Sequence, residues 1–337
     1  MTSQLSPQVL KCVVEYLEVT KRIHITSRSA TLQQIEKSIP ISIDRLQLNK
    51  HSLKLKKLTV KLCPKKTIKF EVDSQEIKIR KQLPEGMDQK ESIKKLFEYY
   101  LGGRSDIYVD RVKFLTQSVT LPENLKLTVN GLDTHTHHVD PFLQYIDQSS
   151  FPLEMLKTVI EDTSAMQHPV VLSAEDLLIA VNENSRIKRL IEYQKIERSH
   201  ICFKYYNLQP DNVVELIEDM RVNKKPVGTT FAFVDEDEEC IFVLLELEKT
   251  FGEFKNELSH VYESFCPTLP KFLIPIDETS QIQVYGCRTN FDCENCEQLV
   301  IKVVGLEEEE SDSDMEELDS EVEDEESEVE DDDSENQ

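Results

Sequence analysis

The sequence predicts an α/β protein built from many short strands, with helices between several of them. Two observations support this prediction. Apolar residues alternate with polar ones, or form short apolar runs, at many places between residues 22 and 304, and both patterns are typical of strands. Stretches with apolar residues three and four positions apart, the spacing of an amphipathic helix, lie before and between these strands.

The negative charge of the chain is concentrated at its C-terminal end. The 337 residues include 64 Asp and Glu and 39 Lys and Arg, a net charge of −25, and residues 307–337 contain 20 of the acidic residues but no basic one. A segment with this charge and no aromatic residue buries too little apolar area to offset its ordering entropy. We therefore expect a disordered tail over residues 306–337.

Composition and motifs weigh against a membrane protein, a secreted protein and a common type of enzyme. No apolar run approaches the ~18 residues that span a bilayer. The amino end lacks a signal-peptide pattern, and the eight scattered cysteines indicate reduced thiols, so we expect a cytoplasmic or nuclear location. Glycine occurs only 8 times, and the phosphate-binding glycine motifs and G-x-S-x-G are absent. We expect no catalytic activity and no cofactor.

Residues 1–21 are expected to form one short amphipathic helix. Ser6 suits the N-cap and Pro7 the first helical position, where a missing N–H costs nothing. An apolar stripe follows, and so short a helix needs a partner surface because it is marginal alone. The stripe consists of Val9, Leu10, Val13, Val14 and Leu17.

Residues 22–106 are expected to be rich in half-buried strands. Pairs of apolar residues two positions apart recur here, and this period puts both members of a pair on one face of a strand. Residues 30–38 and 89–101 have helical spacing instead, and Gly102 and Gly103 end the second of these helices. The pairs are Ile23 and Ile25, Ile41 and Ile43, Leu46 and Leu48, Leu53 and Leu55, Val60 and Leu62, and Ile77 and Ile79.

Residues 107–305 contain a weak repeat of strand cores. Six apolar cores begin 18 to 31 residues apart, with helical pieces between several of them, such as residues 213–221 after the cap-forming Asp211. A strand and a helix in ~20–29 residues is the period of leucine-rich repeats, whose stacked units share one core. We predict an irregular leucine-rich-repeat-like body, with a non-repeating α+β domain as the alternative. The cores are residues 107–109, 125–129, 156–159, 177–181, 201–203 and 231–233.

The body is expected to close with strands. Residues 241–265 are interpreted as a strand that merges into a helix, because a run of five apolar residues precedes a helical spacing. Residues 272–276, 281–286 and 299–304 have the pattern of three closing strands that pair with one another.

Two clusters contain metal-ligating residue types, and neither forms a complete ligand set. Cys293 and Cys296 make a C-x-x-C pair in a polar loop, but a structural zinc site needs four ligands and no second such pair exists. His135, His137 and His138 are flanked by acidic residues, which favours a solvated polar turn. We assign no metal site.

Residues 50–81 form a basic stripe with eleven Lys and Arg and three acidic residues. The lysines alternate with leucines, which favours the solvated face of a sheet. Nucleic-acid binding is not favoured, because Phe70 is the only aromatic residue there that could stack on bases. A third interpretation is that the acidic tail folds back onto the stripe and screens its charge.

Four serines of the tail have an acidic residue three positions on, which is the context favoured by acidophilic casein-type kinases. Each phosphate would add about −1.5 to −2 charges. The other interpretation is an inert solubilising tail. The four serines are Ser311, Ser313, Ser320 and Ser327.

Six segments, taken in order, resemble the nematode F-box C family, whose members share an F-box-associated domain of unknown function. The resemblance runs from about residue 5 to residue 304. The segments are RIHITSRSATLQQIEKSIP (22–40), LGGRSDIYVDRV (101–112), SFPLEML (150–156), GTTFAF (228–233), TFGEF (250–254) and FLIPIDETSQIQVYG (272–286).

The resemblance implies a non-enzymatic, substrate-recruiting subunit of a Skp–cullin–F-box ubiquitin ligase, with a Skp-type adaptor and an unknown protein substrate as partners. An F-box has three helices, whereas the pattern here predicts one, since alternation begins at Ile23. The alternative function is an interaction module, without a role in ubiquitin chemistry, whose acidic tail binds basic nuclear partners such as histones. The resemblance places the adaptor-binding positions at Leu5, Pro7, Val9, Leu10, Val13 and Leu17.

Overall fold

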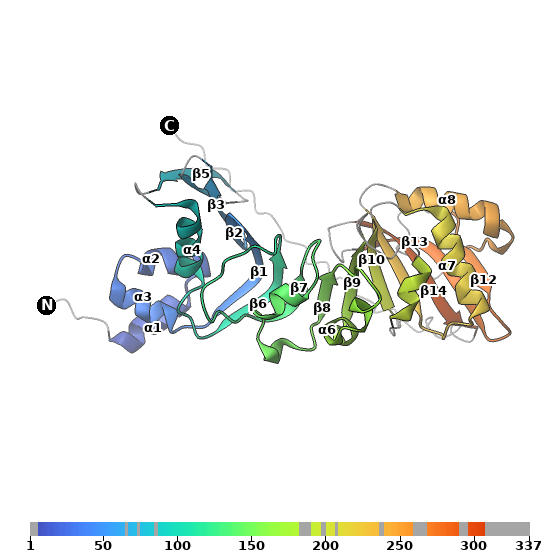
Figure 1. Ribbon diagram of the computed structural model, residues 1–337, viewed down its shortest axis with the longest axis horizontal. Helices are drawn as coiled ribbons and strands as arrows, with labels where there is room; N and C mark the ends of the chain where they lie inside the picture. Colours follow the sequence, from blue (N-terminus) through green and yellow to red (C-terminus); the bar gives the residue numbers. More distant parts are fainter. Residues whose placement is uncertain are drawn as a thin grey trace, which may run out of the picture.

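The protein is an elongated molecule built on one mixed sheet of fourteen strands (Figure 1). The strand order is β12-β13-β14-β11-β10-β9-β8-β7-β6-β1-β2-β3-β4-β5. Leu5, Cys293 and the four tail serines lie outside the residues that the structure describes. The computed structural model describes residues 6–64, 67–72, 75–83, 87–181, 190–196, 200–205, 208–235, 239–258, 268–289 and 296–306.

Five strands form an antiparallel meander at one end of the sheet, as the alternating pattern predicts. Leu53 and Leu55 are buried while Lys57 and Lys61 are exposed, so this part of the sheet has the predicted solvated side. The strands are β1 (Ile41–Asn49), β2 (Ser52–Leu55), β3 (Leu58–Cys63), β4 (Thr67–Val72) and β5 (Gln75–Gln82).

The central strands are parallel, and each one pairs with the next in chain order. β1 pairs with β6, and the series continues one strand at a time to β11. All six apolar cores predicted between residues 107 and 233 overlap these strands. They are β6 (Ile107–Phe114), β7 (Thr128–Asp133), β8 (Met155–Thr158), β9 (Asp176–Val181), β10 (His200–Tyr205) and β11 (Thr230–Asp235).

Three antiparallel strands close the sheet at the other end, which confirms the prediction for residues 272–304. β14 (Cys296–Gly305) lies against β11, β13 (Ser280–Thr289) lies against β14, and β12 (Phe272–Pro275) forms the edge.

Helices cover the two ends of the sheet. α4 (Gln89–Tyr100) packs against β3, begins with the side chain of Asp88 accepting a hydrogen bond from the Glu91 N–H, and is followed by Gly103 at a φ of 67°. α7 (Pro210–Val222) and α8 (Glu239–Phe251) lie together over the end with β10–β14 (Figure 1). The shorter helices are α5 (Asp140–Leu143), α6 (Pro169–Ser173), η1 (Gln148–Ser150), η2 (Ala165–Gln167), η3 (Leu190–Lys195) and η4 (Gly252–Phe254).

The N-terminal segment contains three helices, so the expectation of a single helix followed by a strand is wrong. They are α1 (Pro7–Glu15), α2 (Val19–Thr26) and α3 (Ala30–Lys37), the last as predicted. Glu18 and Ser29 accept hydrogen bonds from the backbone N–H groups of Lys21 and Leu32, and thereby start α2 and α3. Ile23 is therefore helical.

The expected strand at the start of residues 241–265 is also absent, because this apolar run lies in α8. The buried side chains of this helix follow helical spacing, whereas Phe242 and Leu245 on its other side are about half exposed. Residues 259–265 lie outside the described ranges. α7 also differs in detail: its N-cap position is Gln209, and Asp211 lies in the first turn.

One hydrophobic core runs along the whole sheet. Near β10 it is aromatic: the Phe203 ring is stacked against Phe233 and Phe231, with ring centroids 5.2 and 6.1 Å apart, and Tyr193 meets its face edge-on at 5.3 Å. This cluster joins η3 to two parallel strands.

Candidate binding groove

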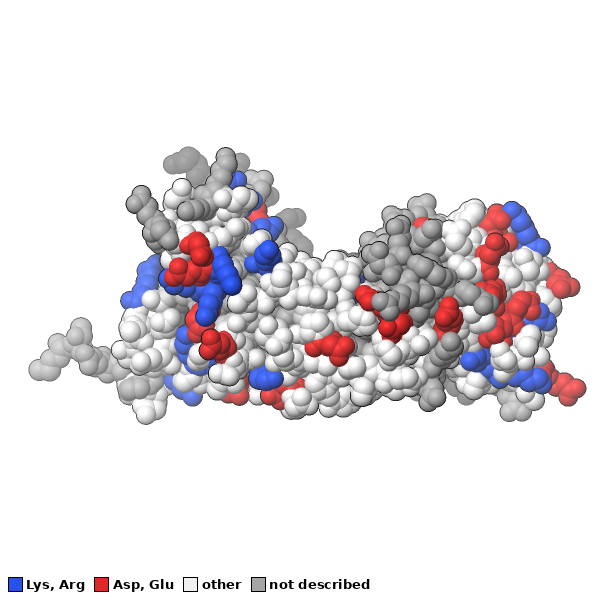
Figure 2. All heavy atoms as spheres, viewed as in Figure 1, with Lys and Arg blue, Asp and Glu red and all other residues white. Residues whose placement is uncertain are grey.

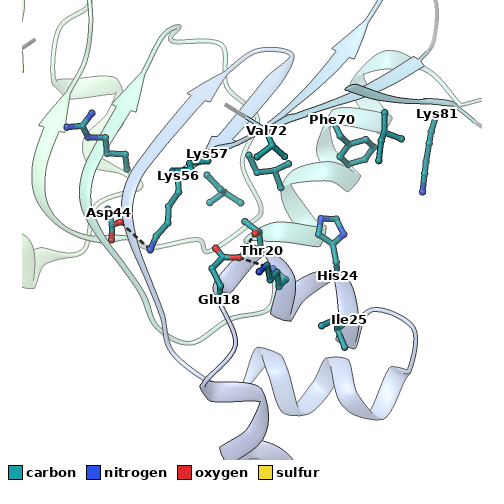
Figure 3. Close-up of a pocket in the computed structure, with 15 residues that line it drawn as sticks. Glu18, Thr20, His24, Ile25, Asp44, Lys56, Lys57, Phe70, Val72 and Lys81 are labelled. Atoms are coloured by element: carbon teal, nitrogen blue, oxygen red, sulfur yellow. Dashed lines mark hydrogen bonds and ion pairs between the residues drawn. The ribbon is translucent and has the colours of Figure 1, made fainter. Parts of the chain in front are cut away.

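A groove of about 1090 Å³ lies between α2 and the antiparallel meander (Figure 3). In Figure 3 Phe70 and Val72 hang from β4 above α2, and His24 points from α2 toward them. One wall is thus a helix, and the other is a set of strands that begins at Ile41, after α3.

Exposed apolar side chains line the groove. Ile25 on α2 is 52% exposed and Ile79 on β5 is 49% exposed, which is unusual for isoleucines that have a core beside them. Phe70 packs against the core with part of its ring and lines the groove with the rest. An exposed apolar surface of this kind marks a place where another apolar group binds.

Cationic side chains outnumber acidic ones around this apolar surface. The lining includes five Lys or Arg residues and two acidic residues. Asp44 is already occupied by Lys56, with a nitrogen–oxygen distance of 3.2 Å. Lys21, Lys57 and Lys81 make no ion pair within the part of the chain that the structure describes. Lys and Arg side chains also surround an acidic patch on this end of the molecule in Figure 2.

The second acidic residue, Glu18, is the N-cap of α2 and is already hydrogen-bonded there. Its carboxylate accepts hydrogen bonds from the Lys21 N–H at 3.1 Å and from the Thr20 hydroxyl. Burial alone would raise the pKa of Glu18, but these hydrogen bonds and the charge of Lys56 outweigh it, so the pKa lies below its ordinary value. Glu18 is therefore ionised and already paired, and the groove keeps a net positive character.

His24 links the groove to the aromatic residues of α4. Its Nε2 lies 3.1 Å from the Tyr100 hydroxyl. The centroid of its ring lies 5.8 Å from that of Tyr100, 6.1 Å from that of Tyr99 and, across the groove, 6.4 Å from that of Phe70 on β4. Burial, with the charge of Lys81, lowers the pKa of His24 below its ordinary value of 6.5. A neutral imidazole can accept a hydrogen bond from the Tyr100 hydroxyl, which keeps its proton because burial raises the pKa of Tyr100.

This pKa predicts a pH dependence of stability. Because the folded His24 resists protonation, the unfolded chain takes up the proton first, and the free energy of unfolding falls as pH drops through 6.5 toward the folded pKa. We expect His24→Gln, which keeps an acceptor for Tyr100 but does not titrate, to lose less stability than the wild type between pH 7.5 and 5.5. Urea denaturation at the two pH values measures this; equal losses would contradict it.

Buried ion pairs hold the helical wall of the groove in place. Arg22 on α2 donates to Glu36 on α3 at 3.2 Å, and Arg104, after α4, binds both oxygens of Glu36 at 2.8 and 2.7 Å. Arg22 and Glu36 are 3% and 1% exposed, and the Arg104 side chain is 1% exposed. One carboxylate thus connects α2, α3 and the end of α4.

The predicted adaptor-binding residues lie on more than one side of α1. Val9 and Val13 are 45% and 53% exposed, and the neighbouring Tyr16 is 93% exposed. Leu10 and Leu17 are partly buried, and Val14 is buried. Pro7 occupies the first helical position and Ser6 caps the helix, both as predicted. The outward-facing apolar residues are therefore Val9, Val13 and Tyr16, the last of which the sequence stripe did not include.

The histidine cluster forms a turn after β7. The backbone N–H of His135 donates to Asp133 at 2.6 Å, and His138 lies 3.7 Å from Glu161, so two of the three histidines have an acidic residue nearby. Within the described ranges, no three His, Cys, Asp or Glu side chains come close enough to hold a metal ion.

Residues 88–237 match a protein family described as a domain of unknown function, DUF3557. The match supports a domain of unknown function over α4 and β6–β11, and nothing in it connects the chain with an F-box family. It includes neither the three N-terminal helices nor the residues that line the groove. No curated protein and no solved structure matches the chain. Among the described helices, none is long and apolar enough to cross a membrane.

Proposed function

We propose that this protein is a non-enzymatic adaptor that recruits a protein substrate, as a subunit resembling those of Skp–cullin–F-box ubiquitin ligases. The observation that carries the proposal is the apolar outer face of α1, formed by Val9, Val13 and Tyr16, which has no partner among the residues described. This face would contact the Skp-type adaptor.

Three features support this assignment. An F-box is a three-helix motif, and three short helices fill residues 7–37 here. α1 packs on α3, so Leu10, Val14 and Leu17 serve the protein itself, while the adjacent side of α1, with Val9, Val13 and Tyr16, is left for a partner. The exposed Cys12 is uncharged and lies three positions after Val9 on the same side of α1, which suits an interface whose centre is apolar.

The body of the protein would present the substrate. Parallel strands that pair in chain order are the arrangement of a stacked, repeat-like solenoid, and this supports the leucine-rich-repeat-like organisation as a proposal. Loops that follow successive strands of such a sheet lie side by side and can together form one recognition surface.

Co-purification with a Skp-type adaptor tests the proposal. We expect the full-length protein to bind, and Val9→Asp with Val13→Asp to reduce affinity more than tenfold, since central interface residues often contribute ~2 kcal/mol or more each. Val222→Asp, on the 77% exposed end of α7, is the matched control and should bind normally. No binding by the wild type, or equal loss in the control, would reject the adaptor role.

The acidic tail supports a second candidate function, binding to basic nuclear partners such as histones. Its 20 acidic residues without a basic one favour such partners by charge alone. Salt-sensitive histone binding that is lost when the chain ends after Gly305 would favour this function over the first.

A further inference from the structure

We propose that the groove between α2 and β2–β5 is a docking site for the chain's own acidic C-terminal segment, centred on Met315, Leu318 and Val322. This intramolecular contact is independent of the adaptor proposal, because the groove and the outer face of α1 share no residue.

The groove selects a ligand that is both anionic and apolar. Its apolar surface contains Ile25 and Ile79, each about half exposed. Around it stand Lys21, Lys57 and Lys81, which make no ion pair with the described residues, while Glu18 and Asp44 are already occupied by the α2 N-terminus and by Lys56. A purely apolar ligand would leave the ammonium groups unmatched, and a purely acidic one would leave the isoleucines in water.

The tail has this combination of side chains. It holds 20 acidic residues and no basic one, yet Met315, Leu318 and Val322 interrupt the acids at intervals of three and four positions. Such intervals suit one face of a helix bound in a groove, with the acidic residues turned toward the cationic rim.

The distance from the end of β14 sets the earliest part of the tail that can reach the groove. Seven strand-to-strand steps separate β14 from β1, and ten separate it from β4; at ~4.8 Å each they span roughly 34–48 Å. An extended chain covers ~3.3–3.6 Å per residue, so about 10–15 residues beyond Leu306 are needed. The groove can therefore be reached from roughly residues 316–321 onward, so Leu318 and Val322 lie within reach and Met315 lies just before the start of this range.

A weak intrinsic affinity is enough for this contact to be populated. The segment and the groove belong to one chain, so the effective concentration of the segment at the groove does not fall when the protein is diluted. Screening of the lysines by salt would weaken the contact, because the charged rim is open to solvent.

Carbodiimide cross-linking of the full-length protein, followed by peptide mass spectrometry, tests the proposal, because this reagent joins carboxylates to lysine ammonium groups without a spacer. We expect tail carboxylates near Met315–Val322 to link to Lys21, Lys57 and Lys81. Lys126 and Lys302 are the comparison lysines; Lys302 lies on β14, near the start of the tail, and would be preferred by a tail that samples space at random. An equal mixture of ¹⁵N-labelled and unlabelled protein separates links within one chain from links between copies.

Two variants separate the groove contact from general charge attraction. Ile25→Asp with Ile79→Asp should lower the groove cross-links about tenfold, which corresponds to ~1.4 kcal/mol; Val227→Asp, at an equally exposed valine, should not. In the tail, Met315→Ser with Leu318→Ser and Val322→Ser keeps the charge and should also lower the yield, whereas Val329→Ser should not. Circular dichroism confirms that each variant is folded.

Three results would overturn the proposal. Links mainly to Lys302, or spread evenly over exposed lysines, would show a tail without a docking site. Links only between labelled and unlabelled chains would make a second copy the occupant. A full yield in the tail variant with three serines would reduce the contact to electrostatic screening without use of the apolar groove.

Discussion

Glu36→Ala is expected to lower the free energy of unfolding by about 3–5 kcal/mol. The substitution leaves the guanidinium groups of Arg22 and Arg104 in the interior without a counter-charge. Each would keep only one backbone acceptor, the carbonyl of Pro40 at 3.3 Å for Arg22 and that of Tyr100 at 3.1 Å for Arg104. A buried charge without a partner is among the most destabilising changes that a single substitution can make.

Urea denaturation of the variant measures this effect. Lys95→Ala is the matched control, because it breaks the exposed Lys95–Glu91 pair and should change stability by less than about 1 kcal/mol. Replacing all three charges, with Arg22→Met, Glu36→Leu and Arg104→Met, should restore much of the loss. A loss below about 1 kcal/mol for Glu36→Ala would mean that water reaches this cluster.

Phe203→Ala is expected to destabilise the protein by about 3–5 kcal/mol, the usual range for a buried aromatic residue truncated to alanine. Phe203 is fully buried, and its ring is stacked on Phe233 and Phe231 of the next strand and meets Tyr193 of η3. The truncation removes both the apolar burial and these ring contacts, and leaves a cavity where β10, β11 and η3 meet.

Thermal or urea unfolding measures the loss of stability, and hydrogen exchange shows in which elements the loss arises. Exchange protection should decrease first in β10 and β11. Phe242→Ala, on the 55% exposed side of α8, is the control and should change stability by about 0.5 kcal/mol or less. Equal effects of the two substitutions would argue against a packed aromatic cluster.

Strands were predictable wherever alternation or an apolar run extended over several residues with polar turns beside it. The meander and the parallel series satisfy this condition, as the pairs Leu53 and Leu55, or the buried run of β9, illustrate. The order of the parallel strands was less accessible, because their pairing depends on contacts between residues twenty or more positions apart.

The two misassigned segments fail for one physical reason. A period of two over only four residues, as at Ile23 and Ile25, also occurs when two isoleucines lie on different sides of a helix, and their 3% and 52% exposures show this arrangement. The apolar run at the start of α8 is likewise compatible with a strand or a buried helix. For the segment with Ile23 and Ile25, the N-cap residues Glu18 and Ser29 are a sequence signal that could have favoured helices over a strand.

The groove was only half predictable. Three of its five basic residues, Lys56, Lys57 and Lys81, belong to the predicted basic stripe of residues 50–81, whereas Lys21 and Arg45 lie outside that stripe. Its apolar surface combines Ile25 with Ile79, which are brought together by the packing of α2 beside the meander and carry no shared local pattern. Tyr16, on the outer side of α1, was missed because the apolar stripe of that helix continues inward through Leu17.

An open sheet of fourteen strands has two edges, and their chemistry bears on polymerisation. β12 has four residues and ends with Pro275, and Lys255 forms an isolated antiparallel bridge with Phe272. It therefore offers little free backbone to an added strand. β5, at the other edge, holds three cationic residues within eight. Copies of the protein that approached edge to edge at β5 would repel one another. The sheet can therefore extend to fourteen strands within one chain while resisting continuation into a fibre.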